Sequence, residues 1–92
     1  MSQTCVLRVE FDPDAARDLR KFGAVAEGTI VRYLRQRIAT TENPRRFARP
    51  LTGDLKGLWR YRVGDYRIVA AIEDDRFVVL VVTIGHRREV YD

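Results

Sequence analysis

The chain has 92 residues and a formal net charge of +4, with 46% hydrophobic and 33% charged residues. This is the composition of an ordinary globular domain and excludes a disordered chain. The sequence contains no long apolar run and no signal-peptide pattern, so we expect one cytoplasmic domain over residues 1–92 that does not contact a membrane.

The scarcity of thiol and imidazole groups excludes several kinds of site. The chain has one cysteine, Cys5, and one histidine, His86. These cannot form an internal disulfide or a metal site, and no phosphate-binding or dinucleotide-binding motif occurs. We therefore expect neither a metal nor another cofactor.

The first part of the chain predicts a strand followed by two helices. TCVLRVEF (residues 4–11) alternates in polarity, as a half-buried strand does. Asp12 is a helix N-cap residue, Pro13 suits the first turn, and Gly23 ends that helix. A second helix is expected over Val25–Thr40. It should bury apolar residues spaced by four: Ala26, Ile30, Leu34 and Ile38.

The positive charge is concentrated in the middle of the chain. Residues 44–67 contain seven Lys or Arg and two Asp or Glu. Such a segment predicts a surface for a polyanion, most commonly nucleic acid. TENPRRFARPLTGDLKG (residues 41–57) contains two prolines and two glycines and predicts a long connection. A solvated basic loop would also explain Arg45, Arg46 and Arg49.

LWRYRVGDYRIVA (residues 58–70) predicts a β-hairpin with a two-residue Gly64-Asp65 turn. In this register Arg62 is directly opposite Arg67, and like charges in that position destabilise a strand pair. The arginines either extend into solvent or bind an anion. One face of the hairpin carries Trp59, Tyr61, Val63, Tyr66, Ile68, Ala70 and Ile72. The other face carries Arg60, Arg62, Arg67, Leu58, Val69 and Ala71.

FVVLVVTI (residues 77–84) is apolar on both faces and predicts an interior strand that ends at Gly85. A second two-residue turn at Asp74-Asp75 would place Glu73 opposite Arg76. Residues Val78, Leu80, Val82 and Ile84 would then lie on the face of the arginines. These elements predict an α+β fold in which two consecutive helices pack on one face of a mainly antiparallel four-stranded sheet.

The last segment, GHRREVYD (residues 85–92), adds polar groups that are either an ordinary terminus or part of the basic face. His86 titrates near neutral pH and is a candidate acid or base, although a partly buried turn histidine explains it equally well. Arginines such as Arg87 and Arg88 stabilise charge on phosphate but do not act as bases.

Residues 55–91, LKGLWRYRVGDYRIVAAIEDDRFVVLVVTIGHRREVY, resemble the second half of RelE-type toxins of the RelE/ParE superfamily of toxin–antitoxin systems. The shared pattern is a basic strand, a turn, a "YR" strand, a hydrophobic strand and a "G-H/K-R…Y" ending. The resemblance implies a RelE-like fold and metal-independent cleavage of messenger RNA in the decoding site of the ribosome. In that reaction the 2′-hydroxyl of the RNA attacks the adjacent phosphate.

The resemblance also implies roles for individual residues. The predicted catalytic set is Arg60, Arg62, Arg67, His86, Arg87 and Tyr91, with His86 and Tyr91 as the alternatives for proton transfer. The basic residues predicted to bind RNA are Arg45, Arg46, Arg49, Lys56 and Arg88. A small acidic antitoxin is the expected partner besides the ribosome, because an uncovered apolar patch usually marks a binding surface. Its predicted contacts are Leu58, Val69, Leu80 and Val82.

Two other functions fit the same fold. A ParE-like toxin would inhibit DNA gyrase, although relatives of that kind generally lack the basic set with a terminal tyrosine. A degenerate toxin would bind RNA or antitoxin without catalysis. The basic set favours RNA cleavage.

Overall fold

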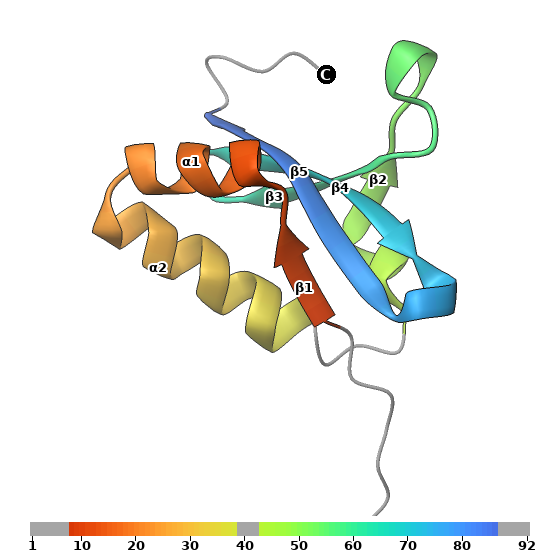
Figure 1. The fold of residues 1–92 in the computed structure, drawn as a ribbon, viewed down its shortest axis with the longest axis horizontal. Helices are drawn as coiled ribbons and strands as arrows, with labels where there is room; N and C mark the ends of the chain where they lie inside the picture. Colours follow the sequence, from red (N-terminus) through yellow and green to blue (C-terminus); the bar gives the residue numbers. More distant parts are fainter. Residues whose placement is uncertain (1–7, 39–42, 87–92) are drawn as a thin grey trace, which may run out of the picture.

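The computed structural model describes residues 8–38 and 43–86. Within these residues two helices lie against one face of a five-stranded sheet whose strand order is β1-β5-β4-β3-β2 (Figure 1). The strands are β1 (Arg8–Phe11), β2 (Ala48–Pro50), β3 (Trp59–Val63), β4 (Tyr66–Glu73) and β5 (Val78–His86). The helices are α1 (Pro13–Lys21) and α2 (Ala24–Tyr33), and α2 continues into a π-helical turn, η1 (Leu34–Ile38). Three 3₁₀ turns complete the order: η2 (Pro44–Phe47), η3 (Gly53–Leu55) and η4 (Asp74–Arg76).

The boundaries of α1 follow from its capping residues, as the sequence predicted. The Asp12 side chain accepts a hydrogen bond of 2.9 Å from the backbone N–H of Asp14, and Pro13 occupies the first turn. A cap of this kind stabilises a helix by about 1 kcal/mol. Gly23 separates the helices with φ of 94°, a value that glycine adopts without strain.

The second helix buries three of its four predicted residues. Ile30, Leu34 and Ile38 are buried, and Ala26 is half-buried. Four residues of an α-helix turn about 40° beyond one full rotation. Side chains spaced by four along a long helix therefore rotate gradually away from the sheet. The wider π-turn η1 compensates for this drift and returns Ile38 to the core. Position 40, the predicted helix end, lies outside the described residues.

The core lies between the helices and one face of the sheet, as predicted. Leu19 of α1 and Ile30 of α2 share one buried cluster with Tyr61, Ile68 and Val79 of the sheet. The β3–β4 hairpin has the predicted register, with Arg62 opposite Arg67, and Gly64 in its turn has φ of 58°. The predicted alternation along this hairpin is therefore confirmed.

The second hairpin differs from the prediction in its turn. Glu73 pairs with Val78 rather than with Arg76, and η4 followed by Phe77 forms the connection. A two-residue primed turn at Asp74-Asp75 would need unusual backbone angles at those residues. The longer connection confines positive φ to Phe77, at 53°. Arg76 still reaches Glu73 at 2.5 Å, but within the turn and not across the strands.

A β-bulge in β5 changes which residues face the core. Val69 pairs with Thr83 while Ala70 pairs with Val81, so Val82 is an extra residue in β5. An extra residue reverses the facing of everything beyond it. Ile84 therefore lies opposite Ile68 in the core, 2% exposed, and not on the face of the arginines as expected.

The sheet is also larger than the predicted four strands. β2 pairs with β3 and lies inside the segment that was expected to be a connection. This strand was not predicted, because three residues that include a proline show no periodicity. β5 passes through Gly85 to His86, so Gly85 does not end the strand. β1 pairs in parallel with β5; residues 4–7 of the predicted first strand, including Cys5, lie outside the described residues.

Among the residues that the structure describes, no helix combines the length and the apolar character needed to cross a membrane.

Candidate nucleic-acid interface

Four arginines on three neighbouring strands share the sheet face that points away from the helices. Arg62 lies directly opposite Arg67 across β3 and β4, and Arg49 of β2 lies directly opposite Arg60 of β3. Side chains of directly paired residues project from the same face of a sheet. We call Arg49, Arg60, Arg62 and Arg67 the arginine surface.

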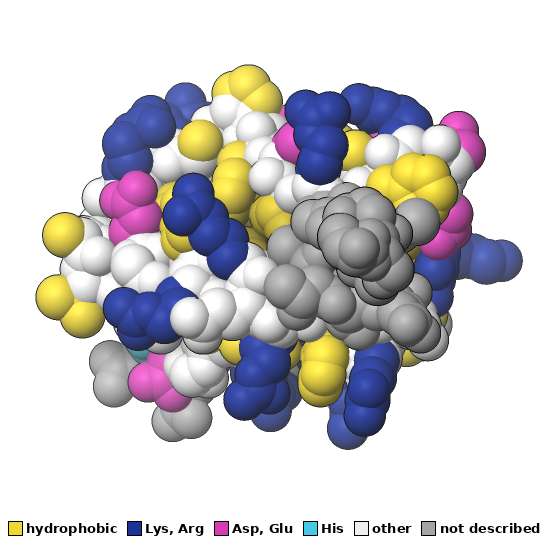
Figure 2. Space-filling view, turned by 90° about the horizontal axis from the view of Figure 1, so that it is seen from below, with side chains coloured by type: hydrophobic (Ala, Val, Ile, Leu, Met, Phe, Trp, Pro, Cys, Tyr) yellow, Lys and Arg dark blue, Asp and Glu magenta, His cyan; other side chains and the backbone are white. Residues whose placement is uncertain are grey.

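Basic side chains also occur elsewhere on the molecule. Figure 2 shows Lys and Arg side chains projecting along much of the outline in the view from below, with fewer Asp and Glu side chains among them. Positive charge alone therefore does not mark the site. The arginine surface is distinguished by the strand register, which brings four guanidinium groups to one end of one face.

The side chains of the arginine surface differ in exposure. Arg49 and Arg62 are exposed, whereas Arg60 and Arg67 are half-buried, and the Nε atom of Arg67 is buried. Partly buried stems hold the charged heads in defined positions. Guanidinium groups keep their charge at neutral pH and hydrogen-bond phosphate in a bidentate manner. Gly85 of β5 lies opposite Arg67 of β4, so β5 adds no side chain beside Arg67.

The other end of the same face carries balanced charge. Arg8 and Glu10 are placed there by their pairing with Val78 and Leu80 of β5. Arg8 lies 2.9 Å from Glu10, and Arg76 lies 4.0 Å from Glu10 and 2.5 Å from Glu73. The face therefore has a basic end near the Gly64 turn and a charge-balanced end near β1 and η4.

His86 lies on the opposite face from the arginine surface. It pairs with Tyr66, and their rings meet edge to face with centroids 5.3 Å apart. Tyr66 in turn contacts Phe22 beside α1, at 5.0 Å between centroids. The expectation that His86 joins the basic face is wrong, because the bulge at Val82 reverses the facing of the end of β5.

The other predicted catalytic residues divide into two groups. The structure brings Arg60, Arg62 and Arg67 together as expected. Arg87 and Tyr91 lie outside the described residues, as does Arg88, which was predicted to bind RNA.

Within residues 44–57, the basic residues predicted to bind RNA have different environments. Arg49 belongs to the arginine surface, and Lys56 is exposed after η3. Arg46 is exposed and lies over the Phe47 ring at 5.5 Å. No sequence pattern indicated that Arg49 pairs with Arg60, because β2 itself was not predicted.

Arg45 is engaged within the protein. Its Nη1 and Nη2 atoms donate to the two carboxylate oxygens of Asp74 at 2.9 and 2.7 Å, and its guanidinium lies 5.5 Å from the Trp59 ring centroid. These hydrogen bonds from Arg45 lower the pKa of the Asp74 carboxyl. The Arg45 charge is thus balanced by Asp74, a partner that the sequence did not reveal.

The predicted apolar patch beside the arginines is smaller than expected. Val69 is 6% exposed and Val78 is 1% exposed, so neither offers a surface to a partner. Leu58, Leu80 and Val82 are half-buried and form what remains of the patch.

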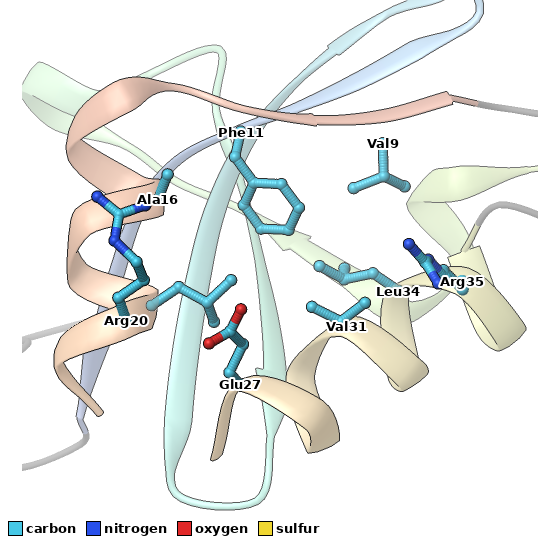
Figure 3. Close-up of a pocket in the computed structure, with 9 residues that line it drawn as sticks. Val9, Phe11, Ala16, Arg20, Glu27, Val31, Leu34 and Arg35 are labelled. Atoms are coloured by element: carbon cyan, nitrogen blue, oxygen red, sulfur yellow. The ribbon is translucent and has the colours of Figure 1, made fainter. Parts of the chain in front are cut away.

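A cavity of about 420 Å³ opens on the helix side of the sheet, between α1, α2 and β1 (Figure 3). Its apolar lining comes from β1, α1, α2 and η1: Val9, Phe11, Ala16, Leu19, Val31 and Leu34. Three charged residues complete the lining: Arg20, Glu27 and Arg35. The cavity is separate from the arginine surface. No group of three or more His, Cys, Asp or Glu side chains that could hold a metal ion occurs within residues 8–38 and 43–86.

Comparisons with known proteins identify the family of this chain. A family model described as the ParE toxin of the type II toxin–antitoxin system parDE matches residues 9–91. Toxin RelE of Mycobacterium tuberculosis is 34% identical over 91 residues, covering 99% of this chain and 92% of that protein. Toxin RelG of the same organism is 29% identical over 83 residues, covering 90% of this chain and 93% of that protein.

Solved structures give the same result. The toxin–antitoxin complex RelBE2 of Mycobacterium tuberculosis contains a chain that matches with a TM-score of 0.82 at 26% identity, covering 97% of this chain and all (100%) of that chain. The isolated RelE toxin of E. coli matches with a TM-score of 0.66 at 21% identity, covering 87% of this chain and 83% of that chain. The chain therefore belongs to the RelE/ParE superfamily of toxins of type II toxin–antitoxin systems, in its RelE-like branch.

Proposed function

We propose that this toxin is a ribosome-dependent endoribonuclease that cleaves messenger RNA and so inhibits translation. The observation that carries the proposal is the arginine surface, in which Arg62 faces Arg67 and Arg49 faces Arg60. Four guanidinium groups at one end of a sheet face are poor design for stability and suit a phosphodiester.

The proposed reaction needs no metal. The 2′-hydroxyl of the RNA loses its proton and its oxygen forms a bond to the adjacent phosphorus. The bond from phosphorus to the 5′-oxygen breaks and that oxygen takes up a proton, so the products are a 2′,3′-cyclic phosphate and a 5′-hydroxyl. Arg60, Arg62 and Arg67 donate hydrogen bonds to the phosphate oxygens, where negative charge increases in the transition state. Arg87, near the end of the chain, is assigned the same role.

Proton transfer requires a different group, because arginine does not act as a base at neutral pH. His86 faces the helices and not the arginine surface. Of the two candidates from the sequence, Tyr91 is therefore the group to which we assign proton transfer.

The proposed partner is a small acidic antitoxin. The related structures include toxin–antitoxin complexes such as RelBE2. Leu80 lies on the face of the arginine surface, opposite Ala71 of β4, so an amphipathic segment that crosses this face would cover an apolar side chain and bring carboxylates to the arginines. Such a segment would also exclude RNA phosphate from the arginine surface.

Inhibition of DNA gyrase is the second candidate function. The observation that favours it is the match of residues 9–91 to the ParE toxin family model. Both activities are compatible with the same fold, so an assay must separate them.

The experiment compares both activities in one preparation. Purified toxin is incubated with ribosomes carrying a defined messenger, with the same RNA alone, and with gyrase and relaxed plasmid. We expect cleavage of the ribosome-bound messenger and normal supercoiling. Intact messenger together with blocked supercoiling would establish the gyrase function, and inactivity in both assays would indicate a binding module.

A further inference from the structure

β2 is the weakest part of the arginine surface. It has three residues, lies at the edge of the sheet, pairs only with β3 and ends at Pro50, which has no N–H to donate. A strand this short gains little from pairing alone. Nevertheless β2 carries Arg49 and holds it opposite Arg60.

The 3₁₀ turn η2 leads directly into β2 and is fixed at several points. The Tyr61 hydroxyl, fully buried in β3, donates a 2.5 Å hydrogen bond to the Pro44 carbonyl oxygen. The Asn43 side chain accepts a 3.0 Å hydrogen bond from the Arg45 N–H. These contacts hold the start of η2.

Arg45 ties the same turn to the far end of β4. Its bidentate bond to Asp74 joins residues 29 positions apart, and its guanidinium lies over the Trp59 ring of β3. An exposed ion pair is generally weak. This pair is bidentate and the Arg45 side chain is only 35% exposed, features that strengthen such a contact.

We infer that Arg45 and Asp74 are positioning residues for the arginine surface: their contact holds η2 against β3 and η4, and η2 holds Arg49 of β2 opposite Arg60. The inference rests on the proposed RNA function for its consequence in activity. It reassigns Arg45 from a predicted RNA ligand to a residue that acts through Arg49. It also gives a functional role to Asp74, an acidic residue in the connection between β4 and β5.

The test uses Asp74→Asn in the wild-type and Arg49→Gln backgrounds. If Asp74 acts through Arg49, Asp74→Asn should lower the single-turnover cleavage rate on programmed ribosomes about three- to fivefold in the wild-type background. A loss of this size matches the free energy that an exposed ion pair contributes. In the Arg49→Gln background it should cause no further loss, because the positioned group is already gone. Asp74→Glu should recover most of the rate.

Asp75→Asn is the matched control. Asp75 is the next residue, is exposed and loses the same charge on substitution, so its variant should cleave at the wild-type rate. Equal losses from Asp74→Asn in both backgrounds, or an equal loss from Asp75→Asn, would overturn the inference.

A second measurement does not depend on RNA. The Leu51 N–H, just after β2, donates to the Leu58 carbonyl oxygen at 3.0 Å. Hydrogen exchange at Leu51 should accelerate in Asp74→Asn and remain at the wild-type rate in Asp75→Asn. An unchanged rate in Asp74→Asn would refute the inference, whereas a wild-type protein that cleaves no RNA would refute the proposed function and leave this readout decisive for Arg45 and Asp74.

Discussion

At the scale of single residues, the closest conflict in the sheet is the pairing of Arg62 with Arg67. Like charges directly opposite each other cost a strand pair up to about 1 kcal/mol. Proteins commonly accept such a cost at functional positions and recover stability elsewhere. The core residues on the other face, including Tyr61 and Ile68, supply that stability here.

Replacing Arg62 with glutamine should therefore stabilise the protein while weakening its activity. We expect the free energy of unfolding in low salt to rise by about 0.2–1 kcal/mol, because the like-charge repulsion is removed. The gain should shrink at high salt, where exposed charges are screened. Urea denaturation at two ionic strengths measures both. Arg32→Gln, an exposed position on α2, is the control; lower stability of Arg62→Gln in low salt would refute the repulsion argument.

Tyr61 predicts the behaviour of the protein in alkali. Burial raises the pKa of its phenol far above the ordinary value of 10.0. Above pH about 10 the unfolded chain ionises at this position while the folded protein does not, so stability present below pH 10 should decline as the pH rises further. Equilibrium unfolding from pH 8 to 11 should show this decline, and Tyr61→Phe should reduce its slope. The same slope in Tyr61→Phe would assign the decline to other groups.

At the scale of elements, the bulge at Val82 decides which side chains reach each face. It sends Ile84 into the core, His86 toward α1, and Gly85 to the row of Arg67. If β5 had alternated regularly through Val82, His86 would have shared the face of the arginines, as the sequence suggested. One local irregularity thus accounts for two incorrect assignments.

Deleting Val82 should be less damaging than truncating Ile84. The deletion leaves Thr83 opposite Val69 and Ile84 opposite Ile68, because Val82 is the extra residue of the bulge and pairs with no residue of β4. Ile84→Ala removes a buried side chain and should lower stability by about 2–5 kcal/mol. Chemical denaturation compares the two variants, and a loss from the deletion as large as that from Ile84→Ala would contradict the assignment of Val82 as the extra residue.

The sequence was most informative where local chemistry determines structure. Asp12, Pro13 and Gly23 marked the ends of α1, and the Gly64-Asp65 turn set the register of Arg62 and Arg67. The bulge was not visible because residues 78–82 are apolar throughout, so no polar residue reported a change of face. β2 was not visible because its three residues carry no periodicity and its partner β3 is distant in the sequence.

At the scale of the whole molecule, apolar side chains are accessible on both faces of the sheet. Leu80 lies on the same face as the arginine surface, paired with Ala71 of β4 and with Glu10 of β1, and Val31 lines the cavity between the helices and β1. The charges differ between them: the face of Leu80 carries the four arginines at its basic end, whereas the cavity is lined by Glu27 as well as Arg20 and Arg35. An acidic antitoxin segment should therefore prefer the first.

Antitoxin affinity distinguishes these two surfaces. The partner to test is the product of a small acidic reading frame next to the toxin gene, which the proposed function predicts. Leu80→Glu should weaken binding at least tenfold, because it places a carboxylate in the apolar contact, whereas Val31→Glu should weaken it less. The association rate should fall as salt rises. Calorimetry and stopped-flow mixing on variants with wild-type circular dichroism provide the measurements; a larger loss from Val31→Glu would place the antitoxin at the helix cavity.

The central claim is that the arginine surface is the RNA-cleaving site, and the single-turnover cleavage rate of ribosome-bound messenger tests it most directly. Arg67→Gln should lower that rate by about 10²–10³, the loss seen when one donor to a developing anionic charge is removed. Arg32→Gln, on the opposite face, should cleave within about twofold of wild type, as expected for a surface substitution away from the site. Both variants must retain the wild-type unfolding transition. A folded Arg67→Gln protein that cleaves at the wild-type rate would contradict the account.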